Sequence, residues 1–100
     1  MEYNSGIAPA TTIEADKAEA DGSVTLNWYI TAGQALEYNV YYSEDNQPFV
    51  LWLPNTVWTM ATFMGEAGKS YRFVATSRDR YGNREAFDAN KNIKVVFKAE

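Results

Sequence analysis

The sequence predicts an all-β fold, a seven-stranded antiparallel sandwich. Short segments alternate apolar with polar residues, turn-forming residues separate them, and no long segment repeats apolar residues at the 3.6-residue period of a helix. The chain has 100 residues, with three Trp, seven Tyr and five Phe. A chain of this length needs a core dense in large side chains, and aromatic residues supply one. We expect a flexible N-terminal arm over residues 1–8 and one domain over residues 9–100.

The first two predicted strands lie on either side of the turn signal Asp21-Gly22. The first covers residues 11–14, with a possible continuation over residues 17–20. The second covers residues 23–30. Four alternate residues of this second strand are apolar and are expected to face the core: Val24, Leu26, Trp28 and Ile30.

The next three predicted strands cover residues 36–43, 49–53 and 57–63, because turn residues follow each of them. A sixth strand is predicted over residues 70–78 and a seventh over residues 92–98. The inward side chains of the seventh are expected to be Ile93, Val95 and Phe97.

The longest irregular stretch, residues 79–91, joins the last two predicted strands. Asp79 and Asn83 are expected to bond nearby backbone groups in a tight turn, in which Gly82 supplies a positive φ. The carboxylates of this loop and of the other turns are interpreted as solvated turn residues, because a calcium site needs several converging oxygen atoms.

The composition argues against catalysis. The chain contains no His and no Cys, so a Ser-His-Asp relay, a disulfide, a thiolate metal site and a redox motif are all excluded. Only carboxylates remain as catalytic groups, and a glycosidase must hold two of them across a cleft. A small sandwich with short loops is not expected to offer one. We therefore expect no enzyme, no cofactor and no metal.

The charge pattern favours neither nucleic acid nor membrane as a partner. The net charge is −4, and the arginines of residues 78–84 are interspersed with Asp79 and Glu85. This is typical of a solvated mixed-charge loop and not of a phosphate-binding surface. No apolar run approaches the roughly 20 residues that span a bilayer, and the N-terminus has no signal-peptide pattern.

Four segments together resemble a fibronectin type III domain. They are Val-Thr-Leu-Asn-Trp at 24–28, Tyr-Asn-Val-Tyr-Tyr-Ser at 38–43, Gly-Lys-Ser-Tyr-Arg-Phe at 68–73 and Asp-Arg-Tyr-Gly-Asn at 79–83. The resemblance covers residues 9–98 and is strongest to modules of large bacterial surface and secreted proteins. It implies an immunoglobulin-like sandwich of fibronectin type III topology and an extracellular or cell-surface location. It also implies a tyrosine corner, in which the hydroxyl of Tyr71 bonds a backbone carbonyl.

The predicted strand over residues 57–64 is apolar on both faces, although only one face of a sandwich sheet can reach the core. The family pattern places Phe63 inward, together with Val57, Thr59 and Ala61. The outer side of this sheet then carries four apolar side chains, a surface that we call the apolar face: Tyr29, Trp58, Met60 and Met64. Such a patch marks an interaction site, and Trp and Tyr are frequent binding hot spots.

Three alternatives to an interaction site stay open. The register could be slipped so that Trp58 is part of the core. The N-terminal arm, through Tyr3 and Ile7, could fold over the patch. The apolar residues could also be scattered and merely tolerated.

Two other surfaces are weaker candidates. Alternation gives the opposite sheet an outer set in which packing between two aromatic residues favours a structural role: Tyr41, Val50, Trp52 and Val74. In the loop over residues 79–91, Tyr81 and Phe87 could anchor a partner, and Phe87 could equally fold back to cap the core.

The leading hypothesis is a non-catalytic protein–protein interaction module whose apolar face is buried in a homodimer or against a neighbouring domain. The concentrated departure from the family pattern also fits an interface engineered on a natural scaffold. The alternative is a passive spacer or a carbohydrate-associated module of a bacterial extracellular protein. A lectin-like role would use Trp52 and Tyr41 as platforms that stack on sugar rings.

Overall fold

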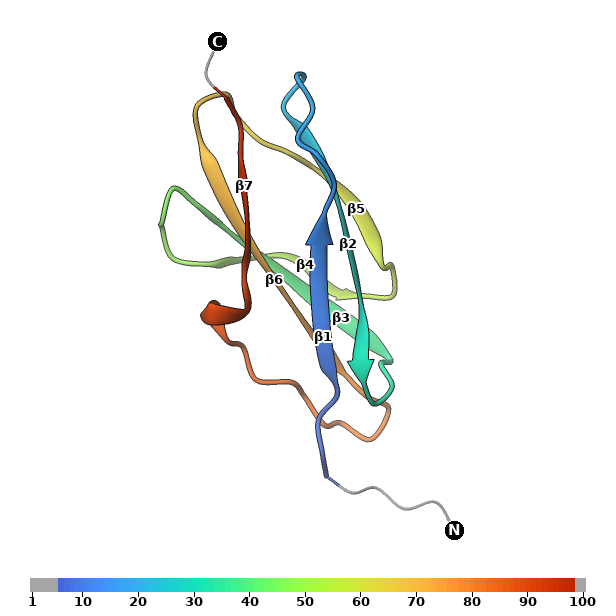
Figure 1. Ribbon diagram of the computed structural model, residues 1–100. Helices are drawn as coiled ribbons and strands as arrows, with labels where there is room; N and C mark the ends of the chain where they lie inside the picture. The colour runs from blue at the N-terminus through green and yellow to red at the C-terminus, as the bar shows by residue number, and fades with distance from the viewer. Residues whose placement is uncertain (1–5, 99–100) are drawn as a thin grey trace.

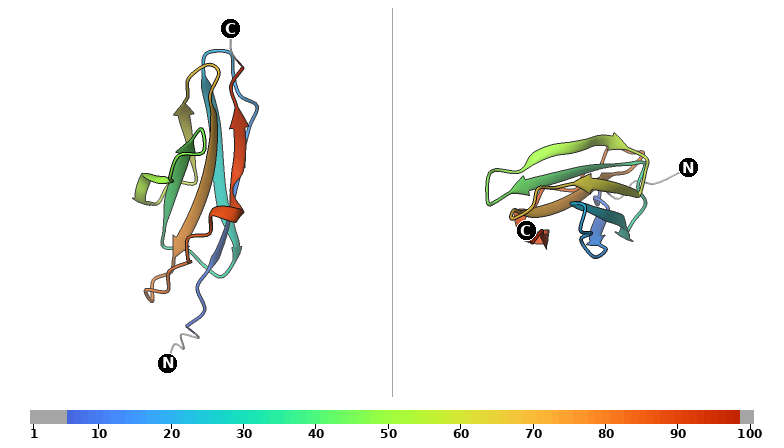
Figure 2. Two further views of the ribbon diagram at one scale, coloured as in Figure 1. Left: turned by 90° about the vertical axis from the view of Figure 1, so that its left-hand side faces the viewer. Right: turned by 90° about the horizontal axis from the view of Figure 1, so that it is seen from above.

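Two antiparallel sheets pack face to face in the computed structural model, which describes residues 6–98 (Figure 1). The smaller sheet has the strand order β1-β2-β5, and its strands are β1 (Ala10–Ala15), β2 (Ser23–Ala32) and β5 (Met60–Met64). The larger sheet has the order β4-β3-β6-β7, and its strands are β3 (Glu37–Glu44), β4 (Val50–Thr56), β6 (Ser70–Arg78) and β7 (Ile93–Val96). Among the described residues the only helix is the single 3₁₀ turn η1 (Ala89–Lys91). The views in Figure 2 show the two layers from the side and from above.

The structure confirms the all-β sandwich and its seven strands, and it corrects several boundaries. β4 continues through Pro54 and Asn55 to Thr56, although these residues were expected to end it, and β7 is shorter than expected. Residues 17–20 do not continue β1 but lie in the loop that leads to β2. β5 begins at Met60, later than expected, because β4 belongs to the larger sheet and β5 to the smaller one. Residues 57–59 therefore cross between the sheets, just after the end of β4, within which Asn55 has a φ of 49°.

The core between the sheets is built around aromatic rings. Val24, Leu26 and Trp28 of β2 are buried as expected, whereas Ile30 is only partly buried. Phe63 of β5 lies at the centre, and its ring contacts four others with centroid distances of 4.9 to 5.2 Å, three of them edge to face: Tyr42, Trp52, Tyr71 and Phe73. Edge-to-face contacts of this kind add to the stabilisation that comes from area burial.

A tyrosine anchors the turn between β5 and β6. Tyr71 is buried, and its hydroxyl accepts a hydrogen bond of 3.0 Å from the backbone N–H of Glu66, so the expected bond to a carbonyl is replaced by one to an amide. Burial raises the pKa of Tyr71. Gly65 is required here by close approach, because a Cβ at this position would lie 2.3 Å from Cε2 of Phe97 and 2.7 Å from Cε2 of Tyr71.

The chain enters and leaves the sandwich at opposite ends. β1 begins near one end of the long axis and β7 ends near the other (Figure 1). Of the predicted N-terminal arm, only residues 6–8 are described, and they form no regular structure; Tyr3 lies outside the described residues. In the part of the chain that is described, no helix is long and apolar enough to cross a membrane.

Candidate functional site: an apolar sheet face

The two methionines of the apolar face project from β5 into solvent. β5 pairs with β2 in a register that sets Met60 against Asn27, Thr62 against Thr25 and Met64 against Ser23. Because side chains alternate along a strand and Phe63 points into the core, the even-numbered residues of β5 point outward. Met60 and Met64 are 60% and 63% exposed.

Trp58 is exposed although its backbone is firmly held. Its carbonyl accepts a 2.8 Å hydrogen bond from Nε1 of the buried Trp28, and its N–H donates to Oγ1 of Thr56 over 3.1 Å. The side chain is nevertheless 65% exposed. A slipped register that buries Trp58 is therefore excluded.

Tyr29 lies at the border of the apolar face. The pairing of β2 with β5 ends at Asn27 and Met60, and beyond it the Trp28 N–H donates a 2.9 Å hydrogen bond to the Thr59 carbonyl, so Tyr29 follows directly after the last contact between the two segments. Tyr29 is 41% exposed, and its hydroxyl donates to Oε2 of Glu14 on β1 over 2.9 Å. This hydrogen bond to a carboxylate raises the pKa of Tyr29. The residue therefore joins the apolar face to the polar surface of β1.

The expected positions of Val57 and Thr59 are wrong. Both were expected to face the core, but both are exposed, and Val57 is 73% exposed. They precede β5 and lie in the crossing between the sheets, where the alternation of a strand does not hold. Pro54 and Asn55, which are turn-forming residue types in the last part of β4, were the available signal for this break.

A pair of hydroxyl groups divides the apolar face. This pair is not evident from the sequence, because its two residues lie on different strands. Oγ1 of Thr62 lies 3.3 Å from Oγ1 of Thr25 on the neighbouring strand, between the two methionines. The face therefore offers flexible apolar side chains on both sides of one central polar contact. Such a surface can bury Met and Trp side chains against a partner while Thr62 and Thr25 keep each other as hydrogen-bond partners.

The outer side of the larger sheet differs from the set expected by alternation. The β3–β4 register shifts between Val40 and Tyr41, and as a result Trp52 and Leu53, although adjacent in sequence, both pack against the core. Trp52 contacts Phe63 and therefore does not pack on Tyr41.

The other members of that set are covered to different degrees. Val74 faces outward from β6 but is buried, and Val50 is exposed. Tyr41 packs on Phe87, with ring centroids 4.8 Å apart. The expected outer set is therefore not a continuous exposed surface.

The loop over residues 79–91 covers much of this outer side. Phe87 packs on Tyr41 and also on Phe49, at a centroid distance of 5.3 Å, and is 43% exposed. It thus folds back onto the outer surface of the sheet and not onto the core. Tyr81 is equally exposed, and its hydroxyl accepts a 2.9 Å hydrogen bond from Nη2 of Arg80.

Two carboxylates hold this loop in place. Asp79 accepts hydrogen bonds from the backbone N–H groups of Tyr81 and Asn83, and Gly82 has a φ of 88°, which confirms the expected tight turn. The hydrogen bond from the Asn83 side chain is the main cause that lowers the pKa of Asp79. The side chain of Glu85, which is only 9% exposed, accepts from the backbone N–H groups of Thr11 and Ser77.

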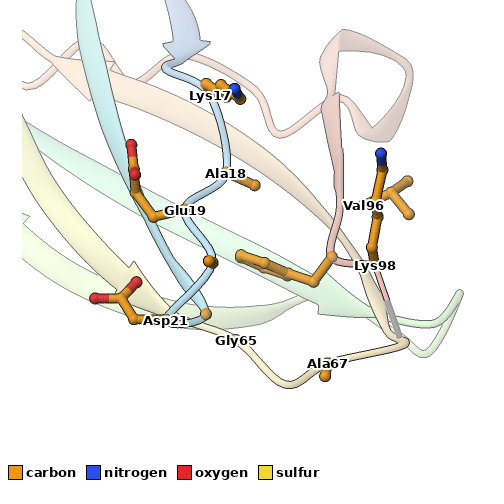
Figure 3. A pocket seen from close by; sticks show the side chains of 11 residues that line it. Lys17, Ala18, Glu19, Asp21, Gly65, Ala67, Val96 and Lys98 are labelled. Carbon is orange, nitrogen blue, oxygen red and sulfur yellow. The ribbon is translucent and has the colours of Figure 1, made fainter. Parts of the chain in front are cut away.

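A shallow pocket opens at the end of the sandwich where β7 ends (Figure 3). Its rim carries charges of both signs, with Glu19 and Asp21 on one side and Lys98 on the other. Asp21 is already engaged by the N–H and the hydroxyl of Ser23. The pocket thus lacks a nucleophile paired with a base, and within residues 6–98 no group of three or more acidic residues is placed to hold a metal ion.

Comparison with known proteins assigns no family. No family model matches the chain, and no curated protein matches its sequence.

Proposed function

We propose that the chain is a fibronectin type III-like module that binds another protein through the apolar face. The strand order supports the family. In a constant-type immunoglobulin domain the fourth strand belongs to the sheet of the first, second and fifth, whereas here β4 pairs with β3. The position of Tyr71, which anchors the turn before β6, gives further support. The family resemblance also makes an extracellular or cell-surface location part of this proposal.

The observation that carries the binding proposal is the exposure of Trp58, Met60 and Met64 on one edge of one sheet. The core is complete without them, because Phe63 on the same strand already fills its place between the sheets. Complete burial of one such side chain contributes about 1.5 to 3 kcal/mol, and these three residues gain only part of that free energy in the isolated chain because they are mostly exposed. Exposed apolar residues gathered in one part of the surface are typical of interaction sites.

Carbohydrate binding has less support. Stacking on a sugar ring needs a free aromatic face, whereas the Trp52 ring packs on Phe63 and Phe73. The Tyr41 ring packs on Phe87. A protein partner for the apolar face is therefore the better proposal.

The test is the solution mass of the purified chain by light scattering, from micromolar to millimolar concentration. The triple variant Trp58→Ser, Met60→Thr, Met64→Thr removes the apolar face. We expect the parent to gain mass with concentration and the variant to remain a folded monomer. A matched control, Leu36→Ser with Val96→Thr, removes exposed apolar residues elsewhere and should behave like the parent.

If parent and triple variant have the same mass at every concentration, self-association through the apolar face is refuted. The spacer function then becomes the better proposal, and the arrangement of the ends favours it, because β1 begins and β7 ends at opposite ends of the sandwich. A passive spacer needs no exposed apolar face, so it does not account for Trp58, Met60 and Met64.

A further inference from the structure

The outer edge of β5 presents unused backbone groups. The Thr59 carbonyl and the Gly65 N–H both bond toward β2. Because the N–H and C=O of one strand residue point to the same side, the odd-numbered residues of β5 are directed at β2 and the even-numbered ones away from it. Among the described residues, no strand pairs with β5 on that second side. The N–H and C=O groups of Met60, Thr62 and Met64 therefore face an open edge.

β5 is also the only edge strand of the described sheets without a protecting residue. Exposed edges are usually blocked by a charge or a proline, which discourage pairing with another chain. β1 carries the exposed Glu14, β4 carries Pro54 and β7 carries the exposed Lys94. β5 has neither a charge nor a proline.

We propose that β5 pairs antiparallel with β5 of a second copy of this chain, centred on Thr62, so that the two smaller sheets become one continuous sheet. This rests on the proposed function and names the partner of the same surface. The sequence of β5, Met-Ala-Thr-Phe-Met, suits such a two-fold arrangement. Thr62 meets Thr62, and each Met60 lies opposite a Met64. Every edge N–H then meets an edge C=O of the partner strand.

Charge and area both favour a second copy. Residues 46–65 carry no charge, so two copies of a chain with a net charge of −4 meet there without repulsion between close side chains. A stable interface buries about 800 Å² per partner, whereas an exposed patch of this size supplies a few hundred. Pairing along the edge adds backbone hydrogen bonds and packs each Met60 against a Met64 of the partner strand, while the rest of the two apolar faces lies side by side on one surface of the continuous sheet.

The experiment introduces a positive or a negative charge at Thr62, the residue at the proposed two-fold centre. Thr62→Lys and Thr62→Glu each place like charges on opposed residues, about 5.5 Å apart between Cα atoms. We expect each variant alone to dimerise up to about fivefold more weakly than the parent. An equimolar mixture of the two should recover the dimer mass. Thr62 is exposed, so both variants are expected to fold.

The matched control repeats the exchange at Thr25, which lies beside Thr62 on β2 and points to the same side. Two copies of Thr25 would be about 14 Å apart, three strand spacings, beyond the screening length of about 8 Å at physiological salt. Mixing Thr25→Lys with Thr25→Glu should therefore give no recovery. A parent that is monomeric at all concentrations, or recovery at Thr25 equal to that at Thr62, would overturn edge pairing.

The two proposals fail in different ways. If the triple variant dissociates the dimer but charges at Thr62 have no effect, the apolar face binds by stacking and the edge inference is wrong. If charges at Thr62 dissociate the dimer and the triple variant remains dimeric, edge pairing stands and the apolar face is not the binding surface.

Discussion

The two outer faces of the sandwich differ in how far other parts of the chain cover their apolar side chains. On the larger sheet, the loop over residues 79–91 folds back so that Phe87 lies on Tyr41 and Phe49, and outward-facing Val74 is buried. On the smaller sheet, no described segment covers Trp58, Met60 or Met64. The larger sheet thus covers part of its outer apolar surface within the chain, although Val50 and Leu51 stay about half exposed, whereas the smaller sheet leaves Trp58, Met60 and Met64 uncovered. The difference shows that an apolar outer residue indicates binding only when the chain itself does not cover it.

The largest expected effect is the loss of stability when the loop over residues 79–91 is no longer held against the larger sheet. Glu85→Ala removes a nearly buried carboxylate that accepts from the N–H groups of Thr11 and Ser77 and pairs with Lys91 at 3.0 Å. Donors left without a partner in a buried site cost about 1 to 3 kcal/mol, so we expect the free energy of unfolding to fall by about 2 to 4 kcal/mol. Urea denaturation at pH 7 measures it.

Lys91→Met is the control for that change. It removes the charge opposite Glu85 and leaves the two backbone hydrogen bonds in place. Because the Lys91 side chain is about half exposed, the loss should be below about 1 kcal/mol. Equal losses for Glu85→Ala and Lys91→Met would mean that the ion pair, and not the link from the loop to β1 and β6, is what matters.

A smaller effect compares one aromatic residue from each face. Phe87→Ala removes two ring contacts, and we expect it to lower the free energy of unfolding by about 1 to 2 kcal/mol. Trp58→Ala should change it by about 0.5 kcal/mol or less, when both are measured by thermal and urea unfolding at a concentration where the chain is monomeric. A larger loss for Trp58→Ala than for Phe87→Ala would reverse the contrast between the faces.

The smallest effect is a dependence on pH at the start of the covering loop. Hydrogen bonds from Asn83 hold the pKa of Asp79 below its ordinary value, so the folded state favours the charged form. The resulting stability is fully present above the ordinary Asp pKa of about 3.9 and is lost as the pH falls from about 4 through the lowered pKa. The stability difference between the parent and Asp79→Asn should therefore be constant from pH 5 to 7 and shrink below pH 4.

The stability of the parent is compared with that of the Asp79→Asn variant because Asp21 also stabilises the folded state through a lowered pKa. Its pKa is also lowered, first by the hydrogen bond from the Ser23 side chain. Both chains lose that contribution on acidification, so it cancels. A stability difference that stays constant down to pH 2 would show that Asp79 does not hold the loop through its charge.

The strands were predictable because each depends on local pattern. In β2, alternation alone identified Val24, Leu26 and Trp28 as core residues, and the structure confirms them. Turn residues marked the loop at Asp79 for the same reason, since a side chain that bonds its own backbone needs no distant partner. The outward position of Met60 and Met64 was predicted from the family resemblance, which places Phe63 inward, because alternation alone leaves both faces of this segment apolar.

What the sequence did not predict depends on contacts between distant segments. Trp52 was expected outward, but the register shift beside it turns two adjacent residues toward the core, and such a shift leaves no mark in the alternation of a single strand. Val57 was expected inward because the crossing between sheets was not recognised. The cover that Phe87 gives to Tyr41 joins residues far apart in the chain, which no local pattern reports.

The opposite placement of the two ends has a mechanical consequence. Tension applied where β1 begins and β7 ends runs along the strands, and hydrogen bonds perpendicular to the strands then resist together in shear. β7 is the shorter of the two terminal strands, with four residues against six in β1, so we expect it to slide from β6 first. The β2–β5 pair carries neither end, and the apolar face would therefore keep its shape while the molecule begins to yield.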